Sequence, residues 1–424
     1  MNESHVTASS IRSKRIFYLA FATITLLVLG LIYAWTILSG PIVAEFPDYK
    51  GVASQVFQVS MFAFCVSALF GAQIIKRASA KAAILVAAAL FGAGFVLTAL
   101  TASLGVWALF AFYGIIGASG CGIAYNAIIS LVNPWFPDKI GLCSGVQMMG
   151  FGVSALALGL LCETAFNTEG IWWGMVFIVI ALVGVLAMLA LAFIVKPAPA
   201  GIAATLGMQG AAATVKESPT KNQSIMSTKV FWLYSIWATF VIACGLALIG
   251  SVKPGATAIG AEAGFAAVLV GLVSTMNGLG RIINGTLFDK FGLVPVMMIS
   301  ASTAIVTMVC LALSVGMAVL PLYVVAAILV ASPYGSVPVM ASAYARQRYK
   351  AADFAKNLGI ANCNIASAAL INIIISGILG SPAAGQGPVI YGILAVLAAI
   401  ALLVVFLFSK VYKSDLAQIA KELE

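Results

Sequence analysis

Charged residues are scarce in this chain. Asp, Glu, Lys and Arg make up only 8% of its 424 residues, whereas 62% of the residues are hydrophobic. A typical soluble domain has about three times that share of charge. The shortage excludes a water-soluble globular fold and indicates an integral membrane protein, whose length is counted in spans of about 20 apolar residues.

Residues for enzyme chemistry are also missing. The single histidine, His5, lies in the polar N-terminal tail, and the seven cysteines have neither paired nor metal-type spacing. No phosphate-binding loop of the GxxxxGK type occurs, and "GASGCG" at 117–122 is typical of small residues that let helices pack closely. We therefore expect no enzyme activity, no metal and no cofactor.

Long apolar runs fill most of the chain. They predict an all-α integral membrane protein with twelve transmembrane helices in two six-helix halves. The predicted spans are 16–39, 52–75, 82–104, 106–132, 140–162, 171–195, 230–252, 265–288, 293–315, 318–342, 357–379 and 387–409.

The positive charges favour one orientation. With the N-terminus inside, nineteen of the 22 Lys and Arg fall on the cytoplasmic side, as the positive-inside rule requires, and only Lys50 and Lys253 fall outside. Both termini are then cytoplasmic, and we expect a plasma (inner) membrane. Orientation and contact with anionic lipid account for the net charge of +9, so no nucleic-acid partner is needed.

A change of composition at 196–229, rich in Ala, Gly, Ser and Lys, predicts a cytoplasmic linker. It separates an N-terminal half, 1–195, from a C-terminal half, 230–424, that ends in a short tail. "KIGLCSG" at 139–145 and "KNLGIAN" at 356–362 begin the fifth and eleventh spans, which indicates a duplicated bundle.

One arginine lies inside a predicted span. Arg281 in "NGLGRIINGTLFDKFG" is eight residues, about 12 Å of helix, before Asp289, so it lies near the middle of the membrane. A charge at that depth persists where it faces a cavity or a partner. No Asp or Glu lies deep in any span, so we expect the counter-ion to come from outside, and a carboxylate suits the guanidinium. The alternative is a structural arginine that reaches the interface.

"GTLFDKFG" at 285–292, at the end of the eighth span, resembles the loop motif of the major facilitator superfamily. Within it, "YAWTILSGPI", "NPWFPDKIGLCSG" and Arg281 after "NGLG" resemble the oxalate/formate antiporter family and the related monocarboxylate transporters. The resemblance implies a bundle whose halves rock around a central site, with a carboxylate substrate paired to Arg281. It also implies that Tyr33, Tyr125 and Tyr334 line the cavity; the alternative places them in the core or the interfacial belt.

Departures from the family pattern bear on the substrate. Ile365 stands where the oxalate transporters have a second cation, a lysine, and Phe151 stands where a tyrosine is usual. One fixed charge favours a monocarboxylate, with Asn362 and Asn364 free to bond a hydroxyl or keto group. An oxalate/formate-type dicarboxylate antiporter remains the alternative.

The residue one helical turn before Arg281 bears on whether transport is coupled to protons. The proton-coupled relatives have an aspartate there, whereas this chain has Asn277, which cannot titrate and is taken as a further substrate-binding candidate. Anion exchange or facilitated diffusion is therefore favoured over proton symport. Asp289 and Lys290 at the inner mouth are expected to act in gating. We expect a carrier that works as a monomer, in preference to a channel or a sensor.

Overall fold

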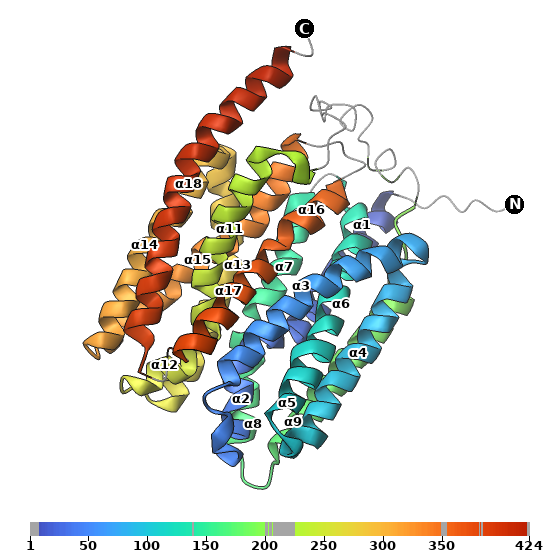
Figure 1. The fold of residues 1–424 in the computed structure, drawn as a ribbon. Coiled ribbons are helices and arrows are strands. Elements are labelled where there is room, and N and C mark those ends of the chain that lie inside the picture. Colours follow the sequence, from blue (N-terminus) through green and yellow to red (C-terminus); the bar gives the residue numbers. More distant parts are fainter. Residues whose placement is uncertain are drawn as a thin grey trace, which may run out of the picture.

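The computed structural model describes residues 8–137, 140–199, 202, 206, 225–348, 354–380, 382 and 385–421, and these form helices and connections without a strand (Figure 1). Twelve helical segments of the described part are long and apolar enough to cross a membrane, which confirms the predicted number. They are Ile11–Glu45, Ala53–Arg77, Ala80–Leu104, Val106–Trp135, Cys143–Phe166, Trp173–Ile194, Lys229–Ile249, Ala263–Phe288, Leu293–Gly316, Leu320–Ala345, Asn357–Leu379 and Gly387–Ser414.

Several of these spans are built from more than one helix. The helices before the predicted linker are α1 Ala8–Leu29, η1 Gly30–Ala34, α2 Trp35–Glu45, η2 Pro47–Tyr49, α3 Ala53–Arg77, α4 Ala80–Thr101, η3 Ala102–Leu104, α5 Val106–Ala108, η4 Leu109–Gly117, α6 Ala118–Val132, η5 Asn133–Trp135, α7 Ile140–Ala157, α8 Gly159–Phe166 and α9 Trp173–Ile194. Those after it are η7 Ile225–Ser227, α11 Lys229–Ile249, α12 Val252–Ala258, α13 Ala263–Phe291, α14 Leu293–Gly316, α15 Leu320–Arg348, α16 Phe354–Asn362, α17 Asn364–Leu379 and α18 Gly387–Lys421.

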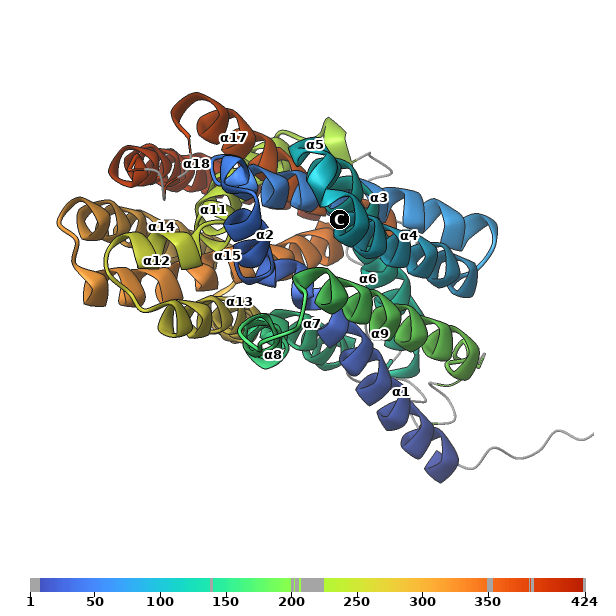
Figure 2. The ribbon, with the colours of Figure 1, turned by 90° about the horizontal axis from the view of Figure 1, so that it is seen from below.

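The helices form two groups. Seen along the bundle, α1–α9 lie on one side and α11–α18 on the other (Figure 2). The groups meet where α7 packs against α13 and where α3 packs against α17. The exact boundaries of the halves stay a prediction, because most of the proposed linker at 196–229 lies outside the described residues.

Glycines permit the closest approach between the groups. A Cβ added to Gly152 on α7 would lie 3.0 Å from the Cα of Gly278 on α13. At the same place the Ser274 hydroxyl donates to the Gly152 carbonyl oxygen at 2.6 Å. Small residues therefore hold α7 and α13 backbone against backbone, as is common between membrane helices.

Helices are interrupted near the centre of the bundle. The first span passes through the 3-10 turn Gly30–Ala34, and α15 contains Pro333, which removes one backbone donor from the helix. α16 and α17 are separated at Cys363. In a membrane such irregular backbone is tolerated where it is buried in protein or lines a cavity, and Tyr33 and Tyr334 lie at two of these interruptions.

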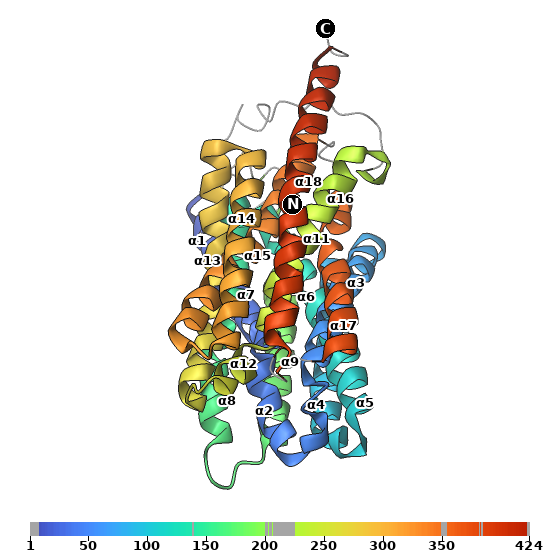
Figure 3. The ribbon, with the colours of Figure 1, turned by 60° about the vertical axis from the view of Figure 1, so that its left-hand side comes forward.

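The start of α1 and the end of α18 lie at the same end of the bundle, which we call the terminal end (Figures 1 and 3). This agrees with an even number of spans. α18 continues to Lys421, beyond the predicted limit of 409, so the first part of the predicted tail prolongs the last span. The added turns stay helical because the sequence from 410 to 421 contains no Pro or Gly.

Candidate functional site

Arg281 lies on the inner face of α13. Its side chain is 8% exposed, and no other charged side chain is buried among those that the structure describes. One guanidinium nitrogen, Nη1, donates to the hydroxyl of Tyr125 on α6 at 3.2 Å. The buried Nε has no hydrogen-bond partner among the described residues. The charged Arg281 of the second helix group therefore contacts a neutral hydroxyl of the first group. Its guanidinium keeps a further N–H donor that bonds to no described residue.

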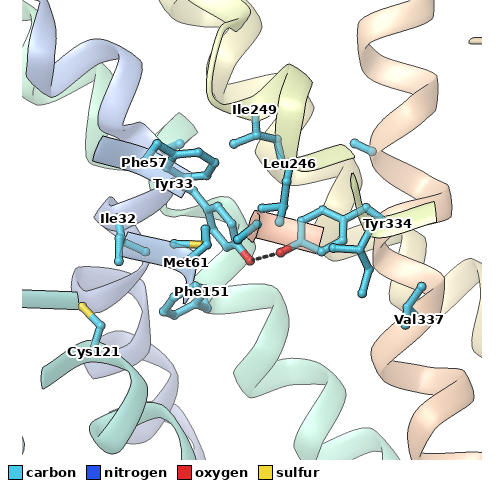
Figure 4. Close-up of a cluster of buried hydrophobic side chains, with 14 of the residues drawn as sticks. Ile32, Tyr33, Phe57, Met61, Cys121, Phe151, Leu246, Ile249, Tyr334 and Val337 are labelled. Atoms are coloured by element: carbon cyan, nitrogen blue, oxygen red, sulfur yellow. Dashed lines mark hydrogen bonds between the residues drawn. The ribbon is translucent and has the colours of Figure 1, made fainter. Parts of the chain in front are cut away.

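Two tyrosines meet beside this arginine. The hydroxyls of Tyr33 in η1 and Tyr334 on α15 are 2.9 Å apart, and their rings meet at a steep angle (Figure 4). Both side chains are buried, and both lie near Arg281. The three predicted tyrosines, Tyr33, Tyr125 and Tyr334, are thus brought together around Arg281 from three helices of the two groups.

Phe151 on α7 joins these tyrosines into one aromatic wall. Its ring centroid lies 5.3 Å from that of Tyr33 and 5.2 Å from that of Tyr125, both edge-on. We call Arg281, Tyr33, Tyr125, Tyr334 and Phe151 the central cluster. Because Phe151 has no hydroxyl, its ring can pack against a ligand but cannot hydrogen-bond to it.

Phe64 on α3 completes the wall and was missed from the sequence. Its ring lies 5.5 Å from Tyr125 and 5.9 Å from Phe151. A signal was available, since Phe57 is seven residues earlier on the same helix face and contacts Tyr33. Phe57 and Phe64, two turns apart on one face, mark the inner side of α3.

The three candidate asparagines differ in what they bond. Asn277, one turn before Arg281, is 1% exposed, and neither atom of its amide has a partner among the described residues. Asn364 donates to the Ala361 carbonyl oxygen at 2.8 Å, so its NH₂ group supports the break between α16 and α17. Asn362 lies half-buried just before that break. The structure thus leaves Asn364 less free for a ligand than expected.

The predicted gating residues lie in the last turn of α13, at the terminal end. Lys290 is exposed, and the Asp289 side chain lies outside the described residues. Their role in gating stays a prediction.

Further polar contacts join the groups and were not predicted. Gln58 on α3 donates to the Leu246 carbonyl oxygen at 3.1 Å, and Asn372 on α17 donates to the Gln58 amide oxygen at 3.4 Å. Towards the end of the bundle opposite the terminal end, Lys253 forms an ion pair with Glu163 at 2.5 Å. The described residues contain no group of three His, Cys, Asp or Glu that could hold a metal ion.

The chain matches a known protein family over more than half of its length. Residues 20–255, more than half of the chain, match the family described as Major Facilitator Superfamily. The oxalate:formate antiporter of Oxalobacter formigenes is 26% identical over 290 residues, which cover 67% of this chain and 66%, just under two thirds, of that protein. An uncharacterized MFS-type transporter of Escherichia coli K12, YhjX, is 25% identical over 315 residues, with 72% and 74% of the two chains covered.

Solved transporter structures share the fold. A D-xylose-proton symporter superposes with a TM-score of 0.69 at 18% identity and covers 93% of this chain and 98% of its own. A POT peptide transporter bound to sulfate gives a TM-score of 0.70 at 13% identity, with 95% of each chain covered. At these identities the likeness concerns the arrangement of helices alone.

Proposed function

The chain belongs to the major facilitator superfamily and is a multi-pass membrane transporter, not an enzyme; from this premise, we propose that it carries small carboxylate anions, with Arg281 as the anchor for the carboxylate. Transport would proceed by alternating access, and by exchange of one anion for another. A single chain contains both helix groups and the whole central cluster, which supports function as a monomer.

The observation that carries this proposal is the missing counter-ion. Arg281 is buried, yet it bonds to the neutral hydroxyl of Tyr125, and no Asp or Glu side chain of the described residues pairs with it. A charge at mid-membrane costs about 3 kcal/mol on insertion scales. A substrate carboxylate bound by the planar guanidinium would offset that cost with charge-assisted hydrogen bonds.

The same charge favours exchange over net flow. An empty carrier must pass through its closed state with Arg281 unneutralised, whereas a loaded carrier passes through it with the charge paired. The loaded form therefore changes sides more easily. Proton symport has less support, because none of the buried side chains that the structure describes is an Asp, Glu or His.

Oxalate is the second candidate substrate, because the Oxalobacter relative is named an oxalate:formate antiporter. A monocarboxylate is favoured by the single buried charge: Ile365, where the resemblance places a second cation, is a half-buried aliphatic residue on α17. A dianion would leave one charge unpaired in a low-dielectric site, which is costly.

The test is uptake of labelled carboxylates into proteoliposomes that are preloaded either with buffer or with unlabelled anion. We expect uptake to depend on the preloaded anion, and formate, acetate or other monocarboxylates to compete better than oxalate. In Arg281→Gln, the loss of a buried charge pair is expected to lower kcat/KM by a factor of about 30 or more. Arg281→Lys should also be impaired, since Lys cannot form the bidentate bond.

A matched control is Lys253→Gln, which removes a cation outside the central cluster and should retain anion selectivity. Uptake by Arg281→Gln at the wild-type rate would overturn the role of Arg281. Stronger competition by oxalate than by any monocarboxylate would favour the second candidate.

A further inference from the structure

The contact between α3 and α17, which joins the two helix groups, has a defined antiparallel register. Near one end of it, Asn372 on α17 donates to the amide oxygen of Gln58 on α3. Near the other end, a Cβ added to Gly359 on α16 would lie 3.4 Å from a side-chain carbon of Leu69 on α3. Residue numbers therefore rise along α3 in the direction in which they fall along α17 and α16.

This register places Cys65 of the first group opposite Cys363 of the second. Cys65 is one turn before Leu69 on α3. Cys363 is one turn after Gly359, and because the helices are antiparallel both steps lead the same way, by about 6 Å. In agreement with this, the backbone N–H of Ala366 in the first turn of α17 donates to the Cys65 sulfur, and Cys363 lies near that sulfur. Since residues three apart on a helix share a face, the two thiols face each other across the contact.

The two thiols lie beside the link between Tyr33 and Tyr334, yet the proposed transport mechanism uses neither of them. Cys65 lies near both tyrosines. Both cysteines are free, but they differ in exposure: Cys65 is buried, whereas Cys363 is half-buried where α16 ends and α17 begins. A more exposed thiol next to a buried one is the arrangement of a redox-sensitive pair, in which the first thiol reacts with an oxidant and the second resolves the product.

We propose that Cys65 and Cys363 form a reversible oxidation site, at which a peroxide joins the two thiols in a disulfide that ties the helix groups together and arrests transport. The inference goes beyond the proposed function and does not depend on the identity of the substrate. A disulfide keeps its two Cβ atoms about 4 Å apart. It would hold α3 and α17 together at this level, whereas alternating access separates the two groups on one side at a time.

The oxidation proceeds in two steps. The thiolate of Cys363 attacks one oxygen of the peroxide and breaks the O–O bond, which leaves a sulfenic acid on Cys363; the released hydroxide takes up the proton that the thiol lost and forms water. The Cys65 sulfur then attacks the Cys363 sulfur, the S–O bond breaks, and hydroxide leaves with the Cys65 proton as a second water. The two thiols together lose two electrons, which the peroxide gains. A small dithiol reverses the reaction by thiol–disulfide exchange.

The experiment treats the wild-type protein in proteoliposomes with hydrogen peroxide and then with dithiothreitol. We expect peroxide to abolish most of the anion exchange and dithiothreitol to restore it. Mass spectrometry of a non-reducing digest should show the peptides that carry Cys65 and Cys363 joined, with a mass about 2 Da below their sum because two hydrogens have been lost. Cys65→Ala and Cys363→Ser should each retain exchange after peroxide.

Cys310→Ser is the matched control, because it removes another half-buried thiol, on α14, a helix that packs mainly against α15 and α18. This variant should remain as sensitive to peroxide as the wild type. If Cys65→Ala does not fold, Cys363→Ser and the linked peptides of the wild type carry the comparison.

The linked peptide separates this inference from the proposed function, because its detection needs no substrate. Exchange that survives peroxide in the wild type, or inhibition that persists in Cys363→Ser, overturns the inference. Inhibition without the linked peptide, or inhibition that persists in Cys65→Ala, assigns the effect to oxidation of a single thiol and overturns the disulfide. If the protein exchanges no carboxylate, the proposed function fails, and the presence or absence of the linked peptide still decides whether the oxidation site exists.

Discussion

The hydroxyls of Tyr33 and Tyr334 lie 2.9 Å apart although 301 positions separate the two residues in the chain. One residue belongs to the first helix group and the other to the second, so this hydrogen bond links the two groups beside Arg281. A carrier that works by alternating access must break it each time the two groups separate.

Removing either hydroxyl of this pair should therefore weaken the closed state. We expect Tyr33→Phe and Tyr334→Phe each to raise the KM for the substrate a few-fold, because one neutral hydrogen bond contributes about 1 kcal/mol. The double variant should be hardly worse than either single variant, since both remove the same bond. KM values from uptake kinetics provide the measurement. Tyr113→Phe, whose hydroxyl bonds within the first helix group, is the control, and additive effects would contradict the prediction.

Close packing of α7 and α13 should be needed for turnover. A side chain at Gly152 would contact Gly278, so Gly152→Val is expected to force the helices apart and to lower the exchange rate by more than tenfold. Gly145→Val is the control on the same helix, because nothing lies within 4 Å of a Cβ at that glycine. Exchange rates measured at equal amounts of reconstituted protein test this prediction. Equal losses of exchange rate in both variants would contradict it.

A carboxyl group at position 277 should make transport depend on pH. In Asn277→Asp, an ionised carboxylate one turn before Arg281 becomes an internal counter-ion and competes with the substrate. Uptake at pH 7 should fall at least tenfold and recover towards pH 5.5, because a substrate carboxylate on Arg281 raises the pKa of the neighbouring carboxyl and favours its protonation. Wild type should be nearly flat over that range, because its described buried side chains include no Asp, Glu or His. Initial rates across the pH range test this, and a flat profile in Asn277→Asp would refute it.

A second cation should shift the preference towards dianions. Ile365→Lys introduces a positive charge at the position where the family resemblance of the sequence places a second cation. We expect the ratio of oxalate to monocarboxylate uptake to rise about tenfold or more, since each added charge pair in a buried site is worth at least 1–2 kcal/mol. Competition by unlabelled oxalate measures the change. Ile365→Met controls for altered packing, and an unchanged ratio would show that position 365 does not select the charge of the substrate.

The sequence predicts the twelve spans well, because the length and apolar character that a span needs are set by the lipid bilayer and hardly by the neighbouring helices. Arg281 was found for the same reason: a charge in an apolar run is conspicuous. What each polar side chain bonds was not predictable. Asn364 donates to the Ala361 carbonyl oxygen at the end of α16, whereas Asn277 bonds to no described residue, although the sequence presents both as buried amides. The hydrogen-bond partner of a buried amide depends on where helices break and on how each helix is rotated about its axis. Neither can be predicted from the local sequence.

The contact between Arg281 and Tyr125 has a consequence for how the protein is made. α13 carries its charge into the membrane at a late stage of synthesis, when the first six spans have already left the ribosome. The hydroxyl that bonds to this charge belongs to α6, and α13 also packs against α7 of the same first group. Stable integration of the second helix group thus depends on a first group that is already folded, and a C-terminal fragment expressed alone should be retained poorly in the bilayer.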